Sequence, residues 1–198
     1  MKDYFYKKAK SEDYKARSVY KLQEINEKFR IFKTSDRVLD LGSAPGSWVQ
    51  YISNMIKNKG LVIGVDLKAV QGDFPENCIF LTKSIYELNE GDFHKLVKKF
   101  DVITSDMAPS TTGVKDIDQE ASLDLCRAAF KVCATMLELN GHFVFKIFQS
   151  NQVKSFVDEL KKVFKNVQII KPKSTRKISS EIFVVAMNYS NTISLLKD

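Results

Sequence analysis

Short apolar runs alternate with longer stretches in which apolar residues recur at helical spacing. The short runs predict strands at residues 37–41, 61–66, 78–82, 100–105, 142–147, 167–171 and 181–187. The longer stretches predict helices at 12–29, 47–57, 90–98, 119–139 and 152–164. Asn151 is the expected N-cap of the last helix and Gly141 the expected end of the fourth. Residues 107–118 are expected to form a loop, and residues 1–10 a disordered basic tail.

Strands separated by helices need crossover connections, which give a parallel, doubly wound sheet. The last two strands differ, because only nine residues, 172–180, join them. A parallel crossover needs a dozen or more residues, so the final strand should be antiparallel. The sequence thus predicts an α/β fold, with a mostly parallel seven-stranded sheet, an antiparallel last strand and helices on both faces.

This topology predicts where a ligand would bind. In open α/β sheets, ligands bind beyond the carboxyl ends of the parallel strands. Gly42, Asp66, Asp106 and Lys146 lie at four such ends, and an antiparallel last strand brings its first residue, Glu181, to the same edge. We therefore expect these residues to lie near one another.

Composition narrows the class of protein. The 198 residues suit a single domain spanning 1–198, and their net charge of +7 favours polyanionic partners such as RNA. Basic residues concentrate at 2–17 and 171–177, although a solvated lysine-rich surface is the alternative explanation. No apolar run approaches the roughly 20 residues of a membrane span. The three cysteines form no CxxC pair and the two histidines are isolated, so no metal site is expected.

The segment GSAPG joins the first strand to the second predicted helix, as in many nucleotide-binding sites. Gly42 and Gly46 allow a ligand to approach the backbone closely. Pro45, after Ala44, removes an N–H that a pyrophosphate would need, which disfavours a dinucleotide. Asp66, twenty residues after Gly46, could bind both hydroxyls of an adenosine ribose. S-adenosylmethionine, which has a ribose and no phosphate, fits this pattern better, while a purely structural turn is the alternative.

Together, several segments resemble the FtsJ-like family of RNA ribose 2′-O-methyltransferases, whose members have a Rossmann-like class I methyltransferase fold. The resemblance covers residues 14–187, nearly the whole chain, and its ordered motifs make it specific. It rests on YKARSVYKL, VLDLGSAPGSWVQY, GVDL, SDMAP, GHFVFKIFQ and KPKSTRKISSEIFVVA.

This resemblance implies a catalytic tetrad of two lysines and two acids and a set of residues that bind S-adenosylmethionine. The tetrad falls on Lys21, Asp106, Lys146 and Glu181. The cofactor set is Gly42, Ala44, Pro45, Gly46, Trp48, Asp66, Ser84 and Asp106. The chain departs from the bacterial members at Ser84, where they carry an acid near the adenine amino group; the acid in GDF at 72–74 precedes the third strand and is not its equivalent.

Each implied role has a structural alternative. Trp48 either contacts the cofactor or anchors its helix in the core. Lys146 interrupts an apolar strand and could be a general base, since burial or a second cation such as Lys21 lowers the pKa of a lysine. Lys21 alone could be a snorkelling surface lysine, and Glu181 a solvated carboxylate.

The resemblance implies an enzyme that methylates ribosomal RNA, at a large-subunit uridine. The unpaired cysteines indicate an intracellular protein, and a monomer is the default expectation. A tRNA methyltransferase and a non-catalytic RNA-binding protein that kept the fold are the alternatives. A small-molecule methyltransferase fits less well, because no segment remains to form a substrate lid. The sequence does not distinguish cytoplasm, nucleolus and mitochondrion.

Overall fold

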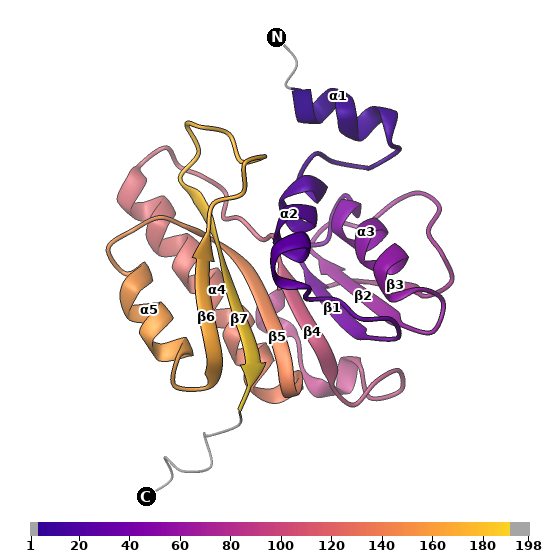
Figure 1. Cartoon of the computed structure of the whole chain (residues 1–198). Helices are drawn as coiled ribbons and strands as arrows, with labels where there is room; N and C mark the ends of the chain where they lie inside the picture. Colours follow the sequence, from indigo (N-terminus) through magenta and orange to yellow (C-terminus); the bar gives the residue numbers. More distant parts are fainter. Residues whose placement is uncertain (1–3, 191–198) are drawn as a thin grey trace, which may run out of the picture.

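The computed structural model describes residues 4–190, and these form one α/β unit (Figure 1). Its strands are β1 (Arg37–Leu41), β2 (Leu61–Asp66), β3 (Cys78–Thr82), β4 (Phe100–Ser105), β5 (Leu137–Phe148), β6 (Phe164–Ile170) and β7 (Glu181–Tyr189). Its helices are α1 (Tyr4–Ser11), α2 (Val19–Phe29), α3 (Ser47–Ile56), α4 (Lys115–Met136) and α5 (Val153–Leu160), with the short 3₁₀ helices η1 (Ile85–Glu87) and η2 (Glu90–Asp92).

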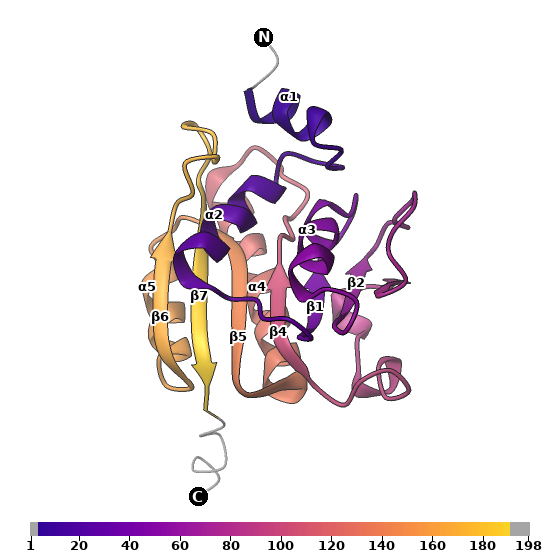
Figure 2. The ribbon, with the colours of Figure 1, turned by 45° about the vertical axis from the view of Figure 1, so that its right-hand side comes forward.

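The strands form a single seven-stranded sheet in the order β3-β2-β1-β4-β5-β7-β6 within the described residues. Strands β1 to β5 are parallel, and β7 is antiparallel to both β5 and β6. The predicted fold class and the direction of the last strand are confirmed. The start of β7 therefore lies at the carboxyl edge of the parallel strands, beside α2 (Figure 2).

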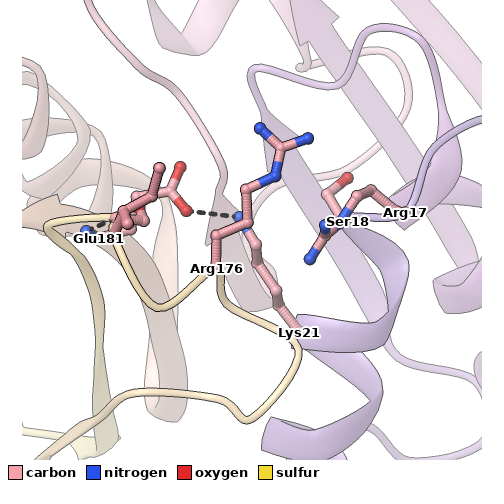
Figure 3. A pocket seen from close by; sticks show the side chains of 7 residues that line it. Arg17, Ser18, Lys21, Arg176 and Glu181 are labelled. Carbon is pink, nitrogen blue, oxygen red and sulfur yellow. Dashed lines mark hydrogen bonds and ion pairs between the residues drawn. The ribbon is translucent and has the colours of Figure 1, made fainter. Parts of the chain in front are cut away.

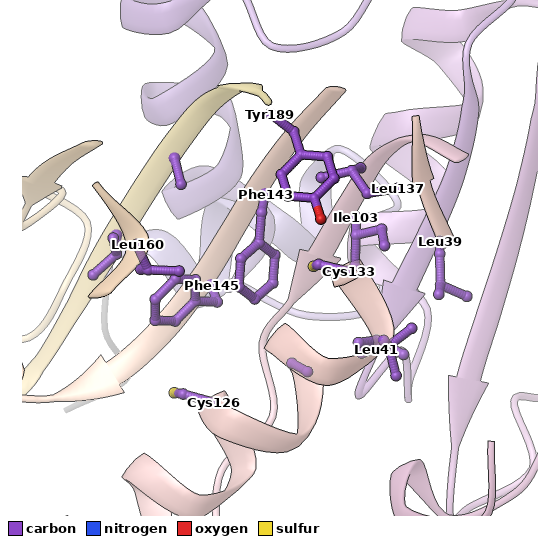
Figure 4. Close-up of a cluster of buried hydrophobic side chains, with 14 of the residues drawn as sticks. Leu39, Leu41, Ile103, Cys126, Cys133, Leu137, Phe143, Phe145, Leu160 and Tyr189 are labelled. Carbon is purple, nitrogen blue, oxygen red and sulfur yellow. The ribbon is translucent and has the colours of Figure 1, made fainter. Parts of the chain in front are cut away.

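Side chains alternate between two apolar layers, one on each face of the sheet. One layer packs under α4 and α5 and includes Leu39, Ile103, Phe143 and Phe145 (Figure 4). The other packs under α2 and α3 and includes the intervening strand residues, such as Val38, Val102 and Val144. Successive residues of a strand point to opposite faces, so Lys146 belongs to the α2 face although its neighbours in sequence lie under α4.

The N-terminal prediction was wrong in two respects. Residues 4–11 form helix α1 rather than a disordered tail, and α1 packs through the buried Ala9 against Val19 and Tyr20. The predicted helix at 12–29 begins only at Val19, because residues 12–18 form turns that carry the chain from α1 to α2. Residues 1–3, including Lys2, lie outside the described part of the chain.

Other helix boundaries also differ from the prediction. The predicted helix at 90–98 is only the short η2, followed by turns that bury Phe93. Helix α4 starts at Lys115, within the predicted loop, and gives way to β5 at Leu137, before Gly141. Helix α5 has Gln152 rather than Asn151 at its N-cap position. Among the described residues, no helix is long and apolar enough to cross a membrane.

Candidate active site

The turn after β1 packs closely against neighbouring loops at its two glycines. Gly42 has φ +78°, and its amide donates to the carbonyl of Val65 at 2.8 Å. A Cβ on Gly42 would lie 2.6 Å from Cγ of Met107, and one on Gly46 would lie 2.5 Å from Cζ of Phe74. The glycines thus serve close packing against neighbouring loops as well as backbone conformation.

Asp66, at the end of β2, ties this turn to the sheet. One carboxylate oxygen accepts the backbone N–H of Ala44 at 3.0 Å, and the other accepts that of Lys68 at 2.8 Å. A carboxylate has about four acceptor positions, so each oxygen keeps capacity for a further donor. This geometry fits the predicted pair of ribose hydroxyls, because the carboxylate is already oriented before any ligand binds.

A cavity of about 360 Å³ opens beside Asp66 at the carboxyl edge of the sheet. Of the residues predicted to bind the cofactor, those that line it are Gly42, Ala44, Asp66, Ser84 and Asp106. Sequence reasoning missed the other lining residues, which are Leu41, Val65, Leu67, Lys68, Lys83, Ile85, Tyr86, Met107, Ala108, Ser110 and Leu125. Most of these lie within two residues of a predicted contact, so their closeness in sequence to the predicted residues could have identified them.

Three residues of the predicted cofactor set do not line this cavity: Pro45, Gly46 and Trp48. Trp48 is only 2% exposed, its ring lies 5.9 Å from that of Phe183, and its Nε1 donates to the carbonyl of Ser18. In this structure Trp48 anchors α3 in the core and connects it to the turn before α2.

The far wall of the cavity lacks an acid at the position that the family resemblance marks. Ser84 lies there and caps η1, its hydroxyl accepting the N–H of Tyr86 at 3.3 Å. Leu67 and Tyr86 are 74% and 67% exposed although both line the cavity. Two exposed side chains with large apolar surfaces are of a kind that can hold a flat ring by packing.

The predicted tetrad forms two ion pairs on the α2 face of the sheet. Lys146 Nζ lies 2.9 Å from Oδ1 of Asp106 and donates to the carbonyl oxygen of Asp106 at 2.6 Å. Lys21 Nζ lies 2.8 Å from Oε2 of Glu181. Both lysines are more than 90% buried, so neither is a snorkelling surface side chain.

Strand register explains why these side chains meet. Lys146 of β5 pairs with Phe183 of β7, and Glu181 lies two residues earlier on β7, so Lys146 and Glu181 share one face. Lys21 reaches the same place from α2, with its Nζ 5.7 Å from the centre of the Phe183 ring. Asp106, which lines the cavity beside Asp66, completes the series.

The neighbours of Glu181 lower the pKa of its carboxyl group. Burial by itself raises the pKa of this carboxyl, but the hydrogen bond from Lys21 and the positive charges of Lys21 and Lys146 outweigh burial and lower the pKa. Two lysines and two carboxylates keep the buried cluster near neutral, which reduces the cost of removing it from water.

A second cavity, of about 400 Å³, is lined by the Lys21–Glu181 pair (Figure 3). Besides that pair it is lined by Arg17, Ser18, Arg176, Ile178 and Ser179. Burial and the positive charge of Arg176 lower the pKa of Arg17. Two guanidinium groups close enough to influence each other make this cavity favourable for an anion.

The sequence reasoning overlooked Asp40, which lies in β1 directly below the site. It is 1% exposed, and its Oδ1 accepts a hydrogen bond from the Thr104 hydroxyl at 2.7 Å. Burial, followed by the negative charges of Asp106 and Asp66, raises the pKa of Asp40 to about 8. An acid between the buried leucines of the strand RVLDL was the sequence feature that could have revealed it.

Within residues 4–190, no cluster of His, Cys, Asp and Glu side chains could hold a metal ion. Cys126 is the cysteine near the tetrad, with its Sγ 3.2 Å from the carbonyl oxygen of Lys146. Burial raises the pKa of this thiol to about 12. It therefore remains protonated and cannot serve as a thiolate nucleophile.

The chain is similar over most of its length to proteins named as ribosomal RNA methyltransferases. A ribosomal RNA large subunit methyltransferase E from Bdellovibrio bacteriovorus is 46% identical over 94% of this chain and 96% of its own length. One from Desulforapulum autotrophicum is 42% identical over 93% of this chain and 91% of its own length. Among solved structures, one described as a ribosomal RNA methyltransferase from Plasmodium falciparum matches with a TM-score of 0.80 and 30% identity, covering 89% of this chain and 98% of that one.

A more distant structure, the fibrillarin of Aeropyrum pernix, shares the fold, with a TM-score of 0.58 and 16% identity over 86% of this chain and 76% of that one. The sequence model of FtsJ-like methyltransferases matches residues 14–189, which include every residue of the proposed tetrad. The chain belongs to the FtsJ-like methyltransferase family.

Proposed function

We propose that this protein transfers a methyl group from S-adenosylmethionine to a ribose 2′-hydroxyl of large-subunit ribosomal RNA. The observation that carries the proposal is the series Asp106–Lys146–Glu181, which joins the two cavities. Asp106 lines one cavity, Glu181 lines the other, and Lys146 lies between them. Relatives named for ribosomal RNA methylation, at 46% and 42% identity, favour this substrate over tRNA.

The cavity beside Asp66 suits the cofactor. Asp66 would hold the ribose, Leu67 and Tyr86 would enclose the adenine, and Asp106 would face the sulfonium. When bound, S-adenosylmethionine supplies a methyl group activated by positively charged sulfur. The chain itself supplies orientation, which accounts for a large part of the acceleration when two reactants are held in line.

The chain also supplies the group that takes the proton. A ribose hydroxyl is a weak nucleophile, and Lys146 in its neutral form would accept the proton from that oxygen at Nζ. The carbonyl and carboxylate of Asp106 fix the position of Nζ. Lys21 and Glu181 would hold the ribose from the second cavity, where the guanidinium groups of Arg17 and Arg176 favour the adjoining phosphate.

The same site is poorly suited to methylation of a base carbon. Methyl transfer to C5 of a pyrimidine requires a nucleophile that activates the ring, commonly a thiolate. Cys126, the cysteine beside Lys146, is buried and has a pKa of about 12. The motif SDMAP also lacks the aromatic residue of amino-group methylases.

The exposed lysines of α1 and of the β6–β7 connection would bind the RNA backbone without reading its sequence. These include Lys10, Lys171, Lys173 and Lys177. An enzyme that binds RNA in this way would select its substrate by the shape of the RNA. We further propose that the protein acts as a monomer in a compartment where ribosomes assemble.

The deciding experiment is methyl transfer followed by nucleoside analysis. Purified protein is incubated with S-adenosylmethionine and either unmodified large-subunit ribosomal RNA, large ribosomal subunits or tRNA, and the digested product is analysed by mass spectrometry. We expect a 2′-O-methylated nucleoside from the ribosomal substrates. A methylated base would refute the assigned chemistry, methylation of tRNA alone would refute the substrate, and absence of transfer to any RNA would favour a binding protein.

A further inference from the structure

The connection between β6 and β7, residues 171–180, carries Arg176 and leads directly into Glu181, the first residue of β7. We refer to this connection as the hairpin loop. Its internal backbone hydrogen bonds are those of two tight turns, from Thr175 to Pro172 at 2.9 Å and from Ser179 to Arg176 at 3.0 Å. The strand pairing of β6 stops at Ile170. The position of the hairpin loop over the active site must therefore depend on contacts with other elements.

Glu24 of α2 provides such contacts. Its two carboxylate oxygens accept the backbone N–H groups of consecutive residues, Lys173 at 2.6 Å and Ser174 at 2.8 Å. Ser174 is 1% exposed and Thr175 is 7% exposed, so the base of the hairpin loop is buried although its side chains are polar. Hydrogen bonds to a charged acceptor are among the strongest that a backbone amide makes.

The contacts from this side of α2 extend along the loop. Lys21 and Glu24 are three residues apart on one face of α2, and Arg17 lies in the turn just before this helix. Arg17 donates to the carbonyl of Ser174, and Lys21 pairs with Glu181. Ser174 is thus bound through both its N–H and its carbonyl, and Lys21 lies between the two residues that bind it.

We propose that Glu24 is a positioning residue for the RNA substrate. It lines neither cavity, so it has no direct contact with the reacting groups. By fixing the hairpin loop on α2, it sets where Arg176 stands relative to the Lys21–Glu181 pair (Figure 3). This inference rests on the proposed function, because it takes RNA as the occupant of the second cavity.

The inference predicts a specific change in kinetics. Without Glu24 the hairpin loop spends only a fraction of the time in its binding geometry, and apparent affinity falls by that fraction. Loss of two charge-assisted hydrogen bonds at full strength would lower that fraction by about a hundredfold, but Arg17 and Lys21 still hold the loop, so we expect a decrease of about tenfold. Glu24→Ala should therefore raise the KM for RNA about tenfold, while kcat at saturating RNA and the Kd for S-adenosylmethionine stay close to those of the wild type.

Two measurements on the full-length protein test this. Hydrogen exchange of the protein without RNA should show faster exchange confined to residues 171–180 in Glu24→Ala. Steady-state methyl transfer to ribosomal RNA then separates KM from kcat. Glu27→Ala, an exposed acid on the same helix, is the matched control and should change neither. Glu24→Gln keeps one acceptor oxygen, so it should give an intermediate KM and replaces the alanine variant if that fails to fold.

An unchanged KM for RNA in Glu24→Ala would overturn the inference. A loss of kcat with unchanged KM would overturn it too, because that is the result expected if the substitution merely reduces the fraction of folded, active protein. Unchanged exchange in the hairpin loop would overturn it as well. Failure of the proposed function is distinguishable, because it would appear in the wild-type protein as absence of methyl transfer to RNA.

Discussion

Replacing Asp66 should weaken cofactor binding far more than it weakens the fold. The carboxylate is oriented by the amides of Ala44 and Lys68 and lines the cavity beside β1. Hydrogen bonds to a charged acceptor contribute about 1.5–3 kcal/mol each. Because Asp66 is partly exposed, the lower value applies, and two ribose hydroxyls together give about 3 kcal/mol. Asp66→Ala should thus raise the Kd for S-adenosylmethionine about a hundredfold.

Isothermal titration calorimetry with S-adenosylmethionine measures this change directly. Asp66→Asn should bind about tenfold more weakly than the wild type, because its amide keeps one acceptor oxygen and turns an NH₂ group toward the other backbone donor. Asp73→Ala is the matched control, since Asp73 is an exposed acid on the neighbouring connection and does not line the cavity. If Asp66→Ala binds within about threefold of the wild type, the assignment of the ribose to Asp66 is wrong.

Three further substitutions probe the tetrad and the acid beneath it. Lys146→Ala should abolish methyl transfer in a radiolabel assay while calorimetry shows intact cofactor binding; retained transfer would refute its role as the base. The folded-state pKa of Glu181 is lowered, so its contribution to stability is present above its ordinary value of 4.5 and lost as pH falls through the folded pKa. Urea unfolding should therefore show a stability gap between wild type and Glu181→Gln at neutral pH that closes on acidification, and a gap independent of pH would contradict this. Asp40 has the opposite sign: its pKa is raised from 3.8 to about 8, so the folded state keeps a proton that the unfolded state has lost, and stability falls as pH rises between these values. Asp40→Asn, which can still accept from Thr104, should lack this loss, and parallel pH–stability curves for the two proteins would refute the raised pKa.

Strands in this protein were easier to predict than helix boundaries, for physical reasons. The apolar runs of β1, β2, β3 and β4 are bounded by polar or glycine residues, and their predicted limits match the structure. Gly141 was expected to end a helix, but β5 already begins at Leu137, which pairs with Phe100 before an irregularity in the register. Pairing with β4 therefore outweighs the local helical pattern. This pairing joins residues far apart in the sequence, so a local pattern cannot reveal it.

The candidate site was predicted in outline by topology and in detail by the family resemblance. The positions of the strand ends and the direction of β7 predict that four residues converge, which are Asp66, Asp106, Lys146 and Glu181. The pairing of Lys146 with the carbonyl of Asp106 depends on backbone placement in a loop, and periodicity does not reveal it. Glu24 looked like an ordinary acid on an amphipathic helix, because its partners lie about 150 positions away in the sequence.

The reversed direction of β7 also places its last residue far from the proposed active site. Glu181 opens the strand at the edge that holds both cavities, whereas Tyr189 closes it at the opposite edge, beside the start of β6 (Figure 1). A protein attached to a sensor surface through the Tyr189 end of β7 would present both cavities to solution. The same polarity recommends that side of the molecule for reporter groups, since a dye or tether there would leave both cavities unobstructed.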